Sequence, residues 1–517
     1  KKTTTNMLNA SLAFGGRCLG RGLLGSSSLL SCVGNKQRFL SNFSDEEIRS
    51  MPLDQWRSEF EEAACDLKAM DVNSITYNDS ATRMRSLLQS RLLLHDDLKL
   101  NPERFFLAHR IIAQHAASLG PGFWVRFTVH YNLCVGTVLE LGNEEHQADL
   151  KQMQQDGLLG CFGLTERHAG VSSGLVVETT ATYDTESETF TLNSPNDGAA
   201  KNWISQGFVG DKIVAIADLK VGGQSYGPHA FFTDLRRGGE LVEGVTVGDM
   251  GRKTVGNDLD NAWIHFNNVE VPKTAMLNKF ADVQNGEYVQ KVKGLPAFHT
   301  IGQRLFSGRV AVAQAAMEFR KSVFAGTLKY AKERKCWSPQ GGRALVTLPH
   351  LSSLIKENEK DTEHLTKFLE KVEKELSSCL VNGKVPGLAL VEAIAAAKVR
   401  VVEDSIEKVH RLQNEVGSFA LMHGSGFEQR DFLTCCKFAE GDSRVLMQKM
   451  ARDRLKVFVA QEEAKTDKNS WSDEQHLCYD LAASVAKDPM SWDERWRDVY
   501  ALSDLIIDRT ITEFMEN

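Results

Sequence analysis

The residues from Gly170 to Gly174 fit the GxSxG pattern of a serine nucleophile elbow. Such an elbow needs a strand before the serine and a helix after it, because the sharp turn between them exposes the hydroxyl. The residues that follow, Leu175 to Tyr183, are instead a β-branched alternating run, which predicts a strand. Since short motifs also match by chance, this context disfavours a serine hydrolase.

The other local signals are weak when each is taken alone. Glycines between Gly157 and Gly163 could approach a phosphate, but they do not fit GxGxxG in a strand-turn-helix setting. The 14 histidines show neither HExxH nor zinc-finger spacing, so no metal site is predicted. The 10 cysteines lack paired CxxC spacing, which predicts no disulfide framework and a reducing compartment.

The secondary-structure pattern of the sequence changes twice along the chain. Residues 45–156 have helical patterning, and their clearest helix begins with Asn101 as N-cap and Pro102 at its first position. Residues 157–272 are rich in β-branched runs and turns, without intervening helices. From about Thr300 the sequence is helical again, with long stretches at 302–334, 351–380 and 391–421.

This order predicts an α+β protein that is mostly α. We expect an N-terminal helical domain, a middle domain and a C-terminal helical bundle. In the middle domain, residues 176–183 and 189–193 read as a hairpin across an acidic turn, which favours an antiparallel β-barrel over a Rossmann unit. The alternating Lys and Glu of residues 351–380 predict a helix with one face in solvent or along a partner subunit.

Charge and composition limit the function classes. The formal net charge of -7 gives no electrostatic reason to expect a nucleic-acid partner. The first 44 residues lack Asp and Glu but carry Arg and Lys among Ser, Gly and Leu, which is typical of an organelle transit peptide. A disordered tail, or sequence upstream of a start at Met7, is the alternative. The short, broken apolar stretches argue against a membrane span.

Several segments, in this order, resemble acyl-CoA oxidases and acyl-CoA dehydrogenases. Most are closest to the oxidases, whereas KNWIS is similar to the KxWIT segment of the dehydrogenases. They are CFGLTE at 161–166, ETTATYD at 178–184, LNSP at 192–195, KNWIS at 201–205, VTVGD at 245–249, KYAKER at 329–334 and EGDS at 440–443. A single short motif can match by chance. An ordered set of motifs on the expected helices and strands is specific for a family resemblance.

The resemblance implies an FAD-dependent acyl-CoA oxidase that forms a trans-2-enoyl-CoA in fatty acid β-oxidation and passes the electrons to oxygen, giving hydrogen peroxide. Glu440 is the implied base, and it takes the α proton in a site dry enough to raise its pKa. The implied flavin-binding residues are Phe162, Leu164, Thr165, Gly170, Trp203, Ser205, Arg334, Gly424, Gly426 and Asp442. The implied substrate-binding residues are Asn257, Asp258 and Arg309. Core packing is the alternative for Trp203, and a solvated helix charge is the alternative for Arg334.

Three residues depart from the family pattern. Ala439 stands where an aromatic residue normally precedes the glutamate, which implies a roomier pocket or a different substrate. Val171 replaces a usual Ser or Thr, and His423 replaces a usual glycine near the cofactor. The substitutions at Ala439 and Val171 keep open a non-catalytic scaffold member of the family as an alternative. Because the segments match both branches of the family, a dehydrogenase that serves a carrier flavoprotein is the other alternative.

The implied organisation is a leader at 1–44, domains at 45–156, 157–275 and 295–456, and a helical extension at 457–517. Expected partners are an acyl-CoA substrate, a second copy in a homodimer or higher homo-oligomer and, for the dehydrogenase alternative, an electron-transfer flavoprotein. The leader favours the mitochondrion, whereas the oxidase resemblance favours the peroxisome.

Overall fold

The structure is a computed structural model that describes residues 44–65, 75–170, 173–292, 305–339, 341–461, 463–465 and 467–516. Residues 1–43 of the predicted leader therefore lie outside the described residues. The first part of the described chain is helical. Its elements are α2 (Asp45–Ser50), α3 (Leu53–Cys65), α4 (Tyr77–Ser90), α5 (Asp97–Leu100), α6 (Pro102–Gln114), α7 (Ala116–Leu119), α8 (Gly122–Thr128), the π-helix η1 (Val129–Val135), α9 (Gly136–Leu141) and α10 (Glu144–Gln155).

Local sequence signals explain where several of these helices begin. Ser44 and Thr76 each form a capping box, in which the side chain accepts from a backbone N–H three residues on and an acidic side chain reaches back. Helix α6 begins at Pro102 as predicted, with Asn101 as its N-cap residue. It ends at Gln114, and the short α7 follows before Gly120.

The middle part of the chain is built of strands, which confirms the predicted β region. Its strands are β1 (Gly160–Gly163), β2 (Thr180–Asp184), β3 (Thr189–Asn193), β4 (Lys201–Ser205), β5 (Lys212–Val221), β6 (Gln224–Asp234), β7 (Arg236–Arg237), β8 (Glu240–Leu241), β9 (Val245–Asp249), β10 (Asn261–Phe266), β11 (Val269–Pro272), β12 (Ala281–Gln284) and β13 (Glu287–Gln290). The two short helices η2 (Asp197–Ala199) and η3 (Lys273–Ala275) lie among them.

The strand pairing differs from the predicted antiparallel barrel. One six-stranded sheet runs in the order β1-β5-β2-β3-β11, with β6 also on β5, and a three-stranded sheet runs β4-β10-β9. The β2–β3 hairpin is antiparallel as expected, but β1 and β2 both pair with β5 in parallel. The prediction of a purely antiparallel arrangement is therefore wrong. Parallel pairs join strands that are distant in the sequence, so no hairpin signal marks them.

The last part of the chain is helical, as predicted. Its main elements are α12 (Leu305–Glu333), the hairpin strands β14 (Lys335–Cys336) and β15 (Arg343–Ala344), α13 (Pro349–Val381), α14 (Leu388–Glu415), α15 (Asp431–Phe438), α16 (Ser443–Ala460), α17 (Asp473–Lys487), α18 (Ser491–Glu494) and α19 (Trp496–Glu516). Short single turns η4 (Leu345–Thr347), η5 (Gly417–Leu421), η6 (Phe427–Gln429), η7 (Glu463–Lys465) and η8 (Lys468–Ser470) connect them.

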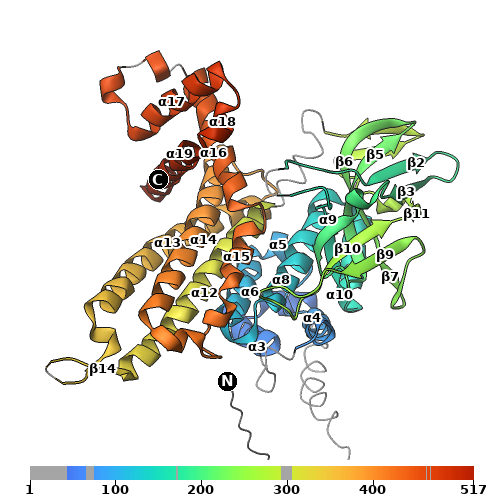
Figure 1. Ribbon diagram of the computed structural model, residues 1–517. Coiled ribbons are helices and arrows are strands. Elements are labelled where there is room, and N and C mark those ends of the chain that lie inside the picture. Colours follow the sequence, from blue (N-terminus) through green and yellow to red (C-terminus); the bar gives the residue numbers. More distant parts are fainter. Residues whose placement is uncertain are drawn as a thin grey trace, which may run out of the picture.

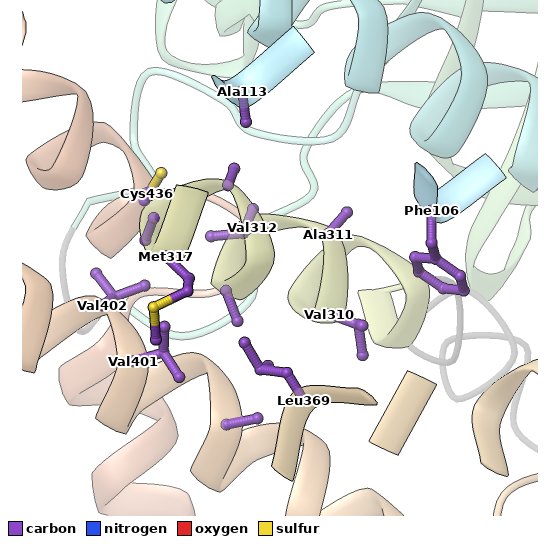
Figure 2. Close-up of a cluster of buried hydrophobic side chains, with 14 of the residues drawn as sticks. Phe106, Ala113, Val310, Ala311, Val312, Met317, Leu369, Val401, Val402 and Cys436 are labelled. Atoms are coloured by element: carbon purple, nitrogen blue, oxygen red, sulfur yellow. The ribbon is translucent and has the colours of Figure 1, made fainter. Parts of the chain in front are cut away.

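Helix α12 lies at the centre of the helical core. Its apolar residues Val310, Ala311, Val312 and Met317 are buried, and residues of α6, α13, α14 and α15 surround them (Figure 2). A helical stretch whose apolar residues point to several sides must be enclosed in this way. The N-terminal helices stand between the sheets and the C-terminal helices, whereas α17 to α19 lie away from the sheets (Figure 1). The start of α12 contacts both helical parts, because Ser307 donates to Asn132 of η1 and Arg309 donates to the carbonyl of Glu440 after α15.

Candidate functional site

Glu440 lies in the tight turn between α15 and α16. Its φ angle is 56°, a left-handed conformation that is rare for a residue with a side chain, and Gly441 follows at 98°. Lys398 of α14 closes this turn, because its Nζ donates to the carbonyls of Lys437 at 2.6 Å and Gly441 at 2.8 Å and to the hydroxyl of Ser443 at 3.0 Å. Strained backbone persists only where its surroundings hold it, and it is often found at active sites.

The side chain of Glu440 is held in an almost dry environment. It is 9% exposed, its Oε1 accepts from Asn132 Nδ2 at 3.3 Å, and its Oε2 has no hydrogen-bond partner. Burial raises the pKa of Glu440 from 4.5 to about 7, against the opposing effects of Arg309, Asn132 and Lys398. A carboxyl group that titrates near neutrality can both take up and release a proton at physiological pH.

Two residues of α12 shape the other side of this carboxylate. The Arg309 guanidinium donates through Nε to the Glu440 carbonyl at 3.1 Å, so it contacts the main chain of Glu440. Gly308 lies so close that a Cβ atom there would be 2.3 Å from Glu440 Cδ. A glycine is therefore required for the carboxylate to lie against the helix.

Asn132 is a site residue that the sequence analysis missed. It lies on the π-helix η1, whose wider turn interrupts the α-helical register between α8 and α9. Such π-turns recur at functional sites in helical proteins. Nothing in the apolar sequence around Asn132 indicates this change of register, so no sequence signal could have found the residue.

A second group of predicted residues meets where the segment after β1 runs beside β4. The backbone N–H of Asn202 donates to the carbonyl of Thr165 at 2.8 Å, which places Thr165 beside Asn202, the residue before Trp203. The neighbouring residues on each segment, Glu166 and Lys201, form a fully buried ion pair of 2.7 Å that holds the two segments together. Ser205, at the end of β4, accepts from Asn261 Nδ2 at 2.9 Å.

Trp203 itself is presented to the surface. It is 57% exposed and has a φ angle of 59°, which rules out the alternative that it is a packed core residue. Thr165 and Gly170 are also exposed, and a Cβ at Gly170 would meet no atom within 4 Å. Leu164 is half-buried and packs against the main core. An exposed aromatic ring beside a hydroxyl and open backbone can accept a planar ligand.

The remaining predicted residues of the first half can be placed more briefly. Phe162 is half-buried in β1 and packs against the main core. Val171 lies outside the described residues. No helix follows Gly174, because residues 175–179 have no regular secondary structure and lead directly into β2, so the structure does not provide the context of a nucleophile elbow.

Gly424 and Gly426, two of the implied flavin-binding residues, lie in a turn before α15 that binds one of its own side chains. Gly424 and Gly426 have φ angles of 82° and 87°. Their N–H groups donate to the two carboxylate oxygens of Glu428, at 2.6 Å and 2.9 Å. Arg334 is exposed just after α12, and Asp442 caps α16 by accepting from the N–H of Arg444 at 2.7 Å.

The predicted substrate residues Asn257 and Asp258 are engaged elsewhere. Asn257 closes a local turn through both its amide atoms and the backbone of Lys253. Asp258 is buried, accepts from Ser80 at 3.1 Å and offers its carbonyl to the buried Arg126. Among the hydrogen bonds and ion pairs of the described residues, none joins either residue to Glu440. Arg309, in contrast, contacts Glu440 directly.

The π-helix connects the two groups of predicted residues. It carries Asn132, which reaches Glu440, and His130, whose Nδ1 accepts from the N–H of Gly160 at the start of β1. A Cβ at Gly160 would lie 2.4 Å from Cys134 Sγ, so β1 is pressed against η1. The π-helix η1 therefore has the buried carboxylate of Glu440 on one side. On another side it contacts β1, the strand that leads to Thr165.

The raised pKa of Glu440 has a consequence for stability. Between pH 4.5 and about 7 the folded protein keeps a proton that the unfolded chain has lost, so this contribution to stability is lost as the pH rises through about 7. The Glu440→Gln variant has no carboxyl group to titrate at this position. Between pH 5 and pH 8 its free energy of unfolding should therefore rise relative to that of the wild type by on the order of a few kcal/mol. Urea unfolding of both proteins at both pH values measures the difference, and an equal difference at the two pH values would disprove the burial argument.

Lys398 should be needed to keep the turn closed. Burial lowers its pKa to about 8, yet its ammonium has three acceptors around the turn. Lys398→Met leaves buried carbonyls without a donor and should destabilise the fold by about 2 to 4 kcal/mol. Arg411→Met on the same helix removes a partly exposed cation and should cost less than about 1 kcal/mol. Equal losses in urea unfolding would show that the lysine contacts are unimportant.

Two absences concern the described residues alone. None of the helices in the described ranges is long and apolar enough to cross a membrane. Within the same ranges, His, Cys, Asp and Glu side chains do not gather in groups of three or more that could hold a metal ion.

Comparison with known proteins gives sequence relatives of one kind. No protein-family model matches the chain. It is 31% identical over 283 residues to an acyl-coenzyme A oxidase of Kluyveromyces lactis, a match that covers 53% of this chain and 37% of that protein. It is 27% identical over 404 residues to the peroxisomal acyl-coenzyme A oxidase 2 of Arabidopsis thaliana, covering 72% of this chain and 55% of that protein. The chain thus spans about half, or less, of these relatives.

Solved structures share the fold over most of the chain. Acyl-CoA oxidase-2 of Caenorhabditis elegans, bound with FAD, ascaroside-CoA and ATP, superposes with a TM-score of 0.72 at 19% identity, covering 93% of this chain and 80% of that one. Butyryl-CoA dehydrogenase of Megasphaera elsdenii gives a TM-score of 0.59 at 19% identity, covering 80% and 96%.

Proposed function

We propose that this chain belongs to the acyl-CoA oxidase and dehydrogenase family and that it is an FAD-dependent acyl-CoA oxidase, which its similarity to acyl-CoA oxidases and its fold support. It converts an acyl-CoA to the trans-2-enoyl-CoA in fatty acid β-oxidation. The observation that carries the proposal is the buried Glu440, whose Oε2 has no partner and whose pKa burial raises to about 7. A base of this kind suits the weakly acidic α proton of a thioester.

The residues of this chain provide a surface that suits FAD. Trp203 is exposed beside Thr165 and Ser205, and there is open space at Gly170. These residues, with Phe162 and Leu164, would line the flavin ring and the pyrophosphate. When bound, FAD supplies the acceptor for the hydride that leaves the β carbon.

The more distant parts of the flavin site fit less closely. In our proposal Arg334, Gly424, Gly426 and Asp442 hold the rest of the cofactor. Arg334 is exposed and available as a cation. The N–H groups of Gly424 and Gly426 already donate to Glu428, so that carboxylate must turn away before the backbone there can contact a phosphate.

In the proposed reaction Glu440 acts with its side chain and its main chain. The carboxylate takes the α proton, and the N–H of the same residue donates to the thioester carbonyl, where negative charge builds up. Arg309 and Lys398 hold this turn from α12 and α14, so the two groups keep one geometry. The small Ala439 before the base leaves room for a substrate other than the usual one, and Asn257 and Asp258 remain proposed substrate residues.

The destination of the electrons separates this proposal from its two alternatives. We expect purified, flavin-loaded protein to form enoyl-CoA and hydrogen peroxide in equal amounts when an acyl-CoA and oxygen are supplied. Enoyl-CoA formation that needs a carrier flavoprotein, without peroxide, would make the chain a dehydrogenase. A protein that binds no flavin and forms no enoyl-CoA would be a scaffold member of the family, and the oxidase proposal would be abandoned.

Location, assembly and domain limits complete the proposal. The Arabidopsis relative is named as peroxisomal, which favours the peroxisome over the mitochondrion for this chain. We also propose a homodimer or higher homo-oligomer, because one face of the charged helix α13 is left uncovered in the single chain. Residues 45–156, 157–275 and 295–456 are proposed as its domains, although α16 continues to Ala460, past the last of these limits.

A further inference from the structure

We propose that Asn132, supported by Ser307, is a positioning residue that makes Oε2 of Glu440 the atom that accepts the substrate proton. The inference rests on the proposed function, because it assigns a role to one oxygen of the proposed base. Three observations carry it: the hydrogen bond from Asn132 to Oε1, the contact that orients Asn132, and the unpartnered state of Oε2.

The orientation of Asn132 follows from what its two neighbours can donate or accept. An ionised carboxylate accepts only, so Asn132 must present its NH2 group to Glu440. The Asn132 amide oxygen then faces α12, where Ser307 Oγ donates to it at 2.7 Å. Ser307 on α12 and Glu440 after α15 thus bind opposite ends of one amide on the π-helix.

This arrangement makes the two oxygens of Glu440 unequal. Oε1 already accepts the N–H of Asn132, whereas the buried Oε2 has no partner. In the neutral acid the oxygen that accepts the hydrogen bond is the carbonyl oxygen, so the proton belongs on Oε2. Oε2 lies beside the missing Cβ of Gly308, which would be 2.5 Å away from it. In the proposed step the C–H bond at the substrate α carbon breaks and its proton bonds to Oε2. The electron pair of that bond forms the new α,β double bond as hydride leaves the β carbon for the proposed FAD acceptor.

The other charged groups around Glu440 do not distinguish its oxygens in this way. Arg309 of α12 donates to the Glu440 carbonyl, and Lys398 of α14 donates to the carbonyls of Lys437 and Gly441. Both favour the charged carboxylate through space. Asn132 is the side chain that hydrogen-bonds the carboxylate itself among the residues that the structure describes.

The test compares flavin-loaded wild type with Asn132→Leu, which keeps the size but removes the amide. We expect kcat for enoyl-CoA formation to fall about tenfold, as for a lost hydrogen bond to a charged group, with KM changed less than about twofold. The acidic limb of the pH profile of kcat should move to higher pH, because the carboxylate loses a donor. Ser307→Ala should also lower kcat and move the acidic limb to higher pH. Ser307→Thr keeps the hydroxyl and should therefore keep the kcat of the wild type.

The matched control is Thr137→Val in α9. Thr137 is fully buried shortly after the π-helix, and its Oγ1 has no partner, so the change alters packing without removing a contact to Glu440. It should leave kcat and the pH profile as in the wild type. A pH profile that is the same in Asn132→Leu as in the wild type would overturn the proposal, whatever the change in kcat.

A second readout does not depend on turnover. The stability difference between each protein and its Glu440→Gln derivative, followed by urea unfolding from pH 5 to pH 9 without substrate, reports the titration of Glu440. In the Asn132→Leu background this titration should move to higher pH, and an unchanged titration would also overturn the proposal. If wild-type protein forms no enoyl-CoA, the proposed function fails, but this comparison still decides whether Asn132 acts on Glu440.

Discussion

Replacing Glu440 by Gln is expected to lower the rate of enoyl-CoA formation by about two to four orders of magnitude, the usual contribution of a general base. The change keeps the size of the side chain and leaves an oxygen that can accept from Asn132. The turn held by Lys398 and Arg309 involves backbone atoms, so it should persist. The variant should therefore fold and bind flavin while losing turnover, as single-turnover kinetics and visible absorbance would measure.

The control for this prediction is Glu407→Gln, an exposed carboxylate on α14 that contacts Arg411. Its turnover should match that of the wild type. Glu440→Gln with more than about one tenth of the wild-type rate would assign the base to another residue.

Gly308→Ala should disturb the base by contact alone. The added Cβ would lie 2.3 Å from Glu440 Cδ and 2.5 Å from Asn132 Nδ2, both far inside normal contact distance. Both partners are ends of side chains, so the protein can fold with the carboxylate displaced. A displacement of about 1 Å in an active site can cost about a hundredfold in rate, and we expect a loss of kcat of that size.

The same helix supplies a close control, Gly326→Ala, because a Cβ there would meet no atom within 4 Å. In the helix interior this substitution should stabilise by up to about 1 kcal/mol and leave kcat unchanged. The steric account would be wrong if both alanine variants kept wild-type kcat, or if they lost activity equally.

The elements could be predicted from sequence wherever local chemistry determines them. The start of α6 at Pro102 and the β2–β3 hairpin follow from caps, turns and alternation. The parallel pairing of β1 with β5 could not be predicted, because it depends on contacts between segments about fifty residues apart.

The site shows the same division. Glu440 was identified from its place in an ordered set of segments, but Asn132 lies in an apolar run whose π-helical register has no signature in the sequence. Asp258 remains a proposed substrate residue, and its contacts with Ser80 and Arg126 could not be predicted, because those residues come from distant parts of the chain. Trp203 is exposed, although large aromatic side chains are more often buried, and this exposure supports its proposed contact with the flavin.

Anaerobic titration of the purified protein with an acyl-CoA tests the central claim most directly. If Glu440 is the base of a flavin-dependent acyl-CoA oxidation, the visible flavin absorbance should bleach within one equivalent of substrate and enoyl-CoA should form in the same amount. Glu440→Gln should stay yellow under the same conditions. A wild-type protein that is colourless, or whose flavin is not reduced by any acyl-CoA, would contradict the account.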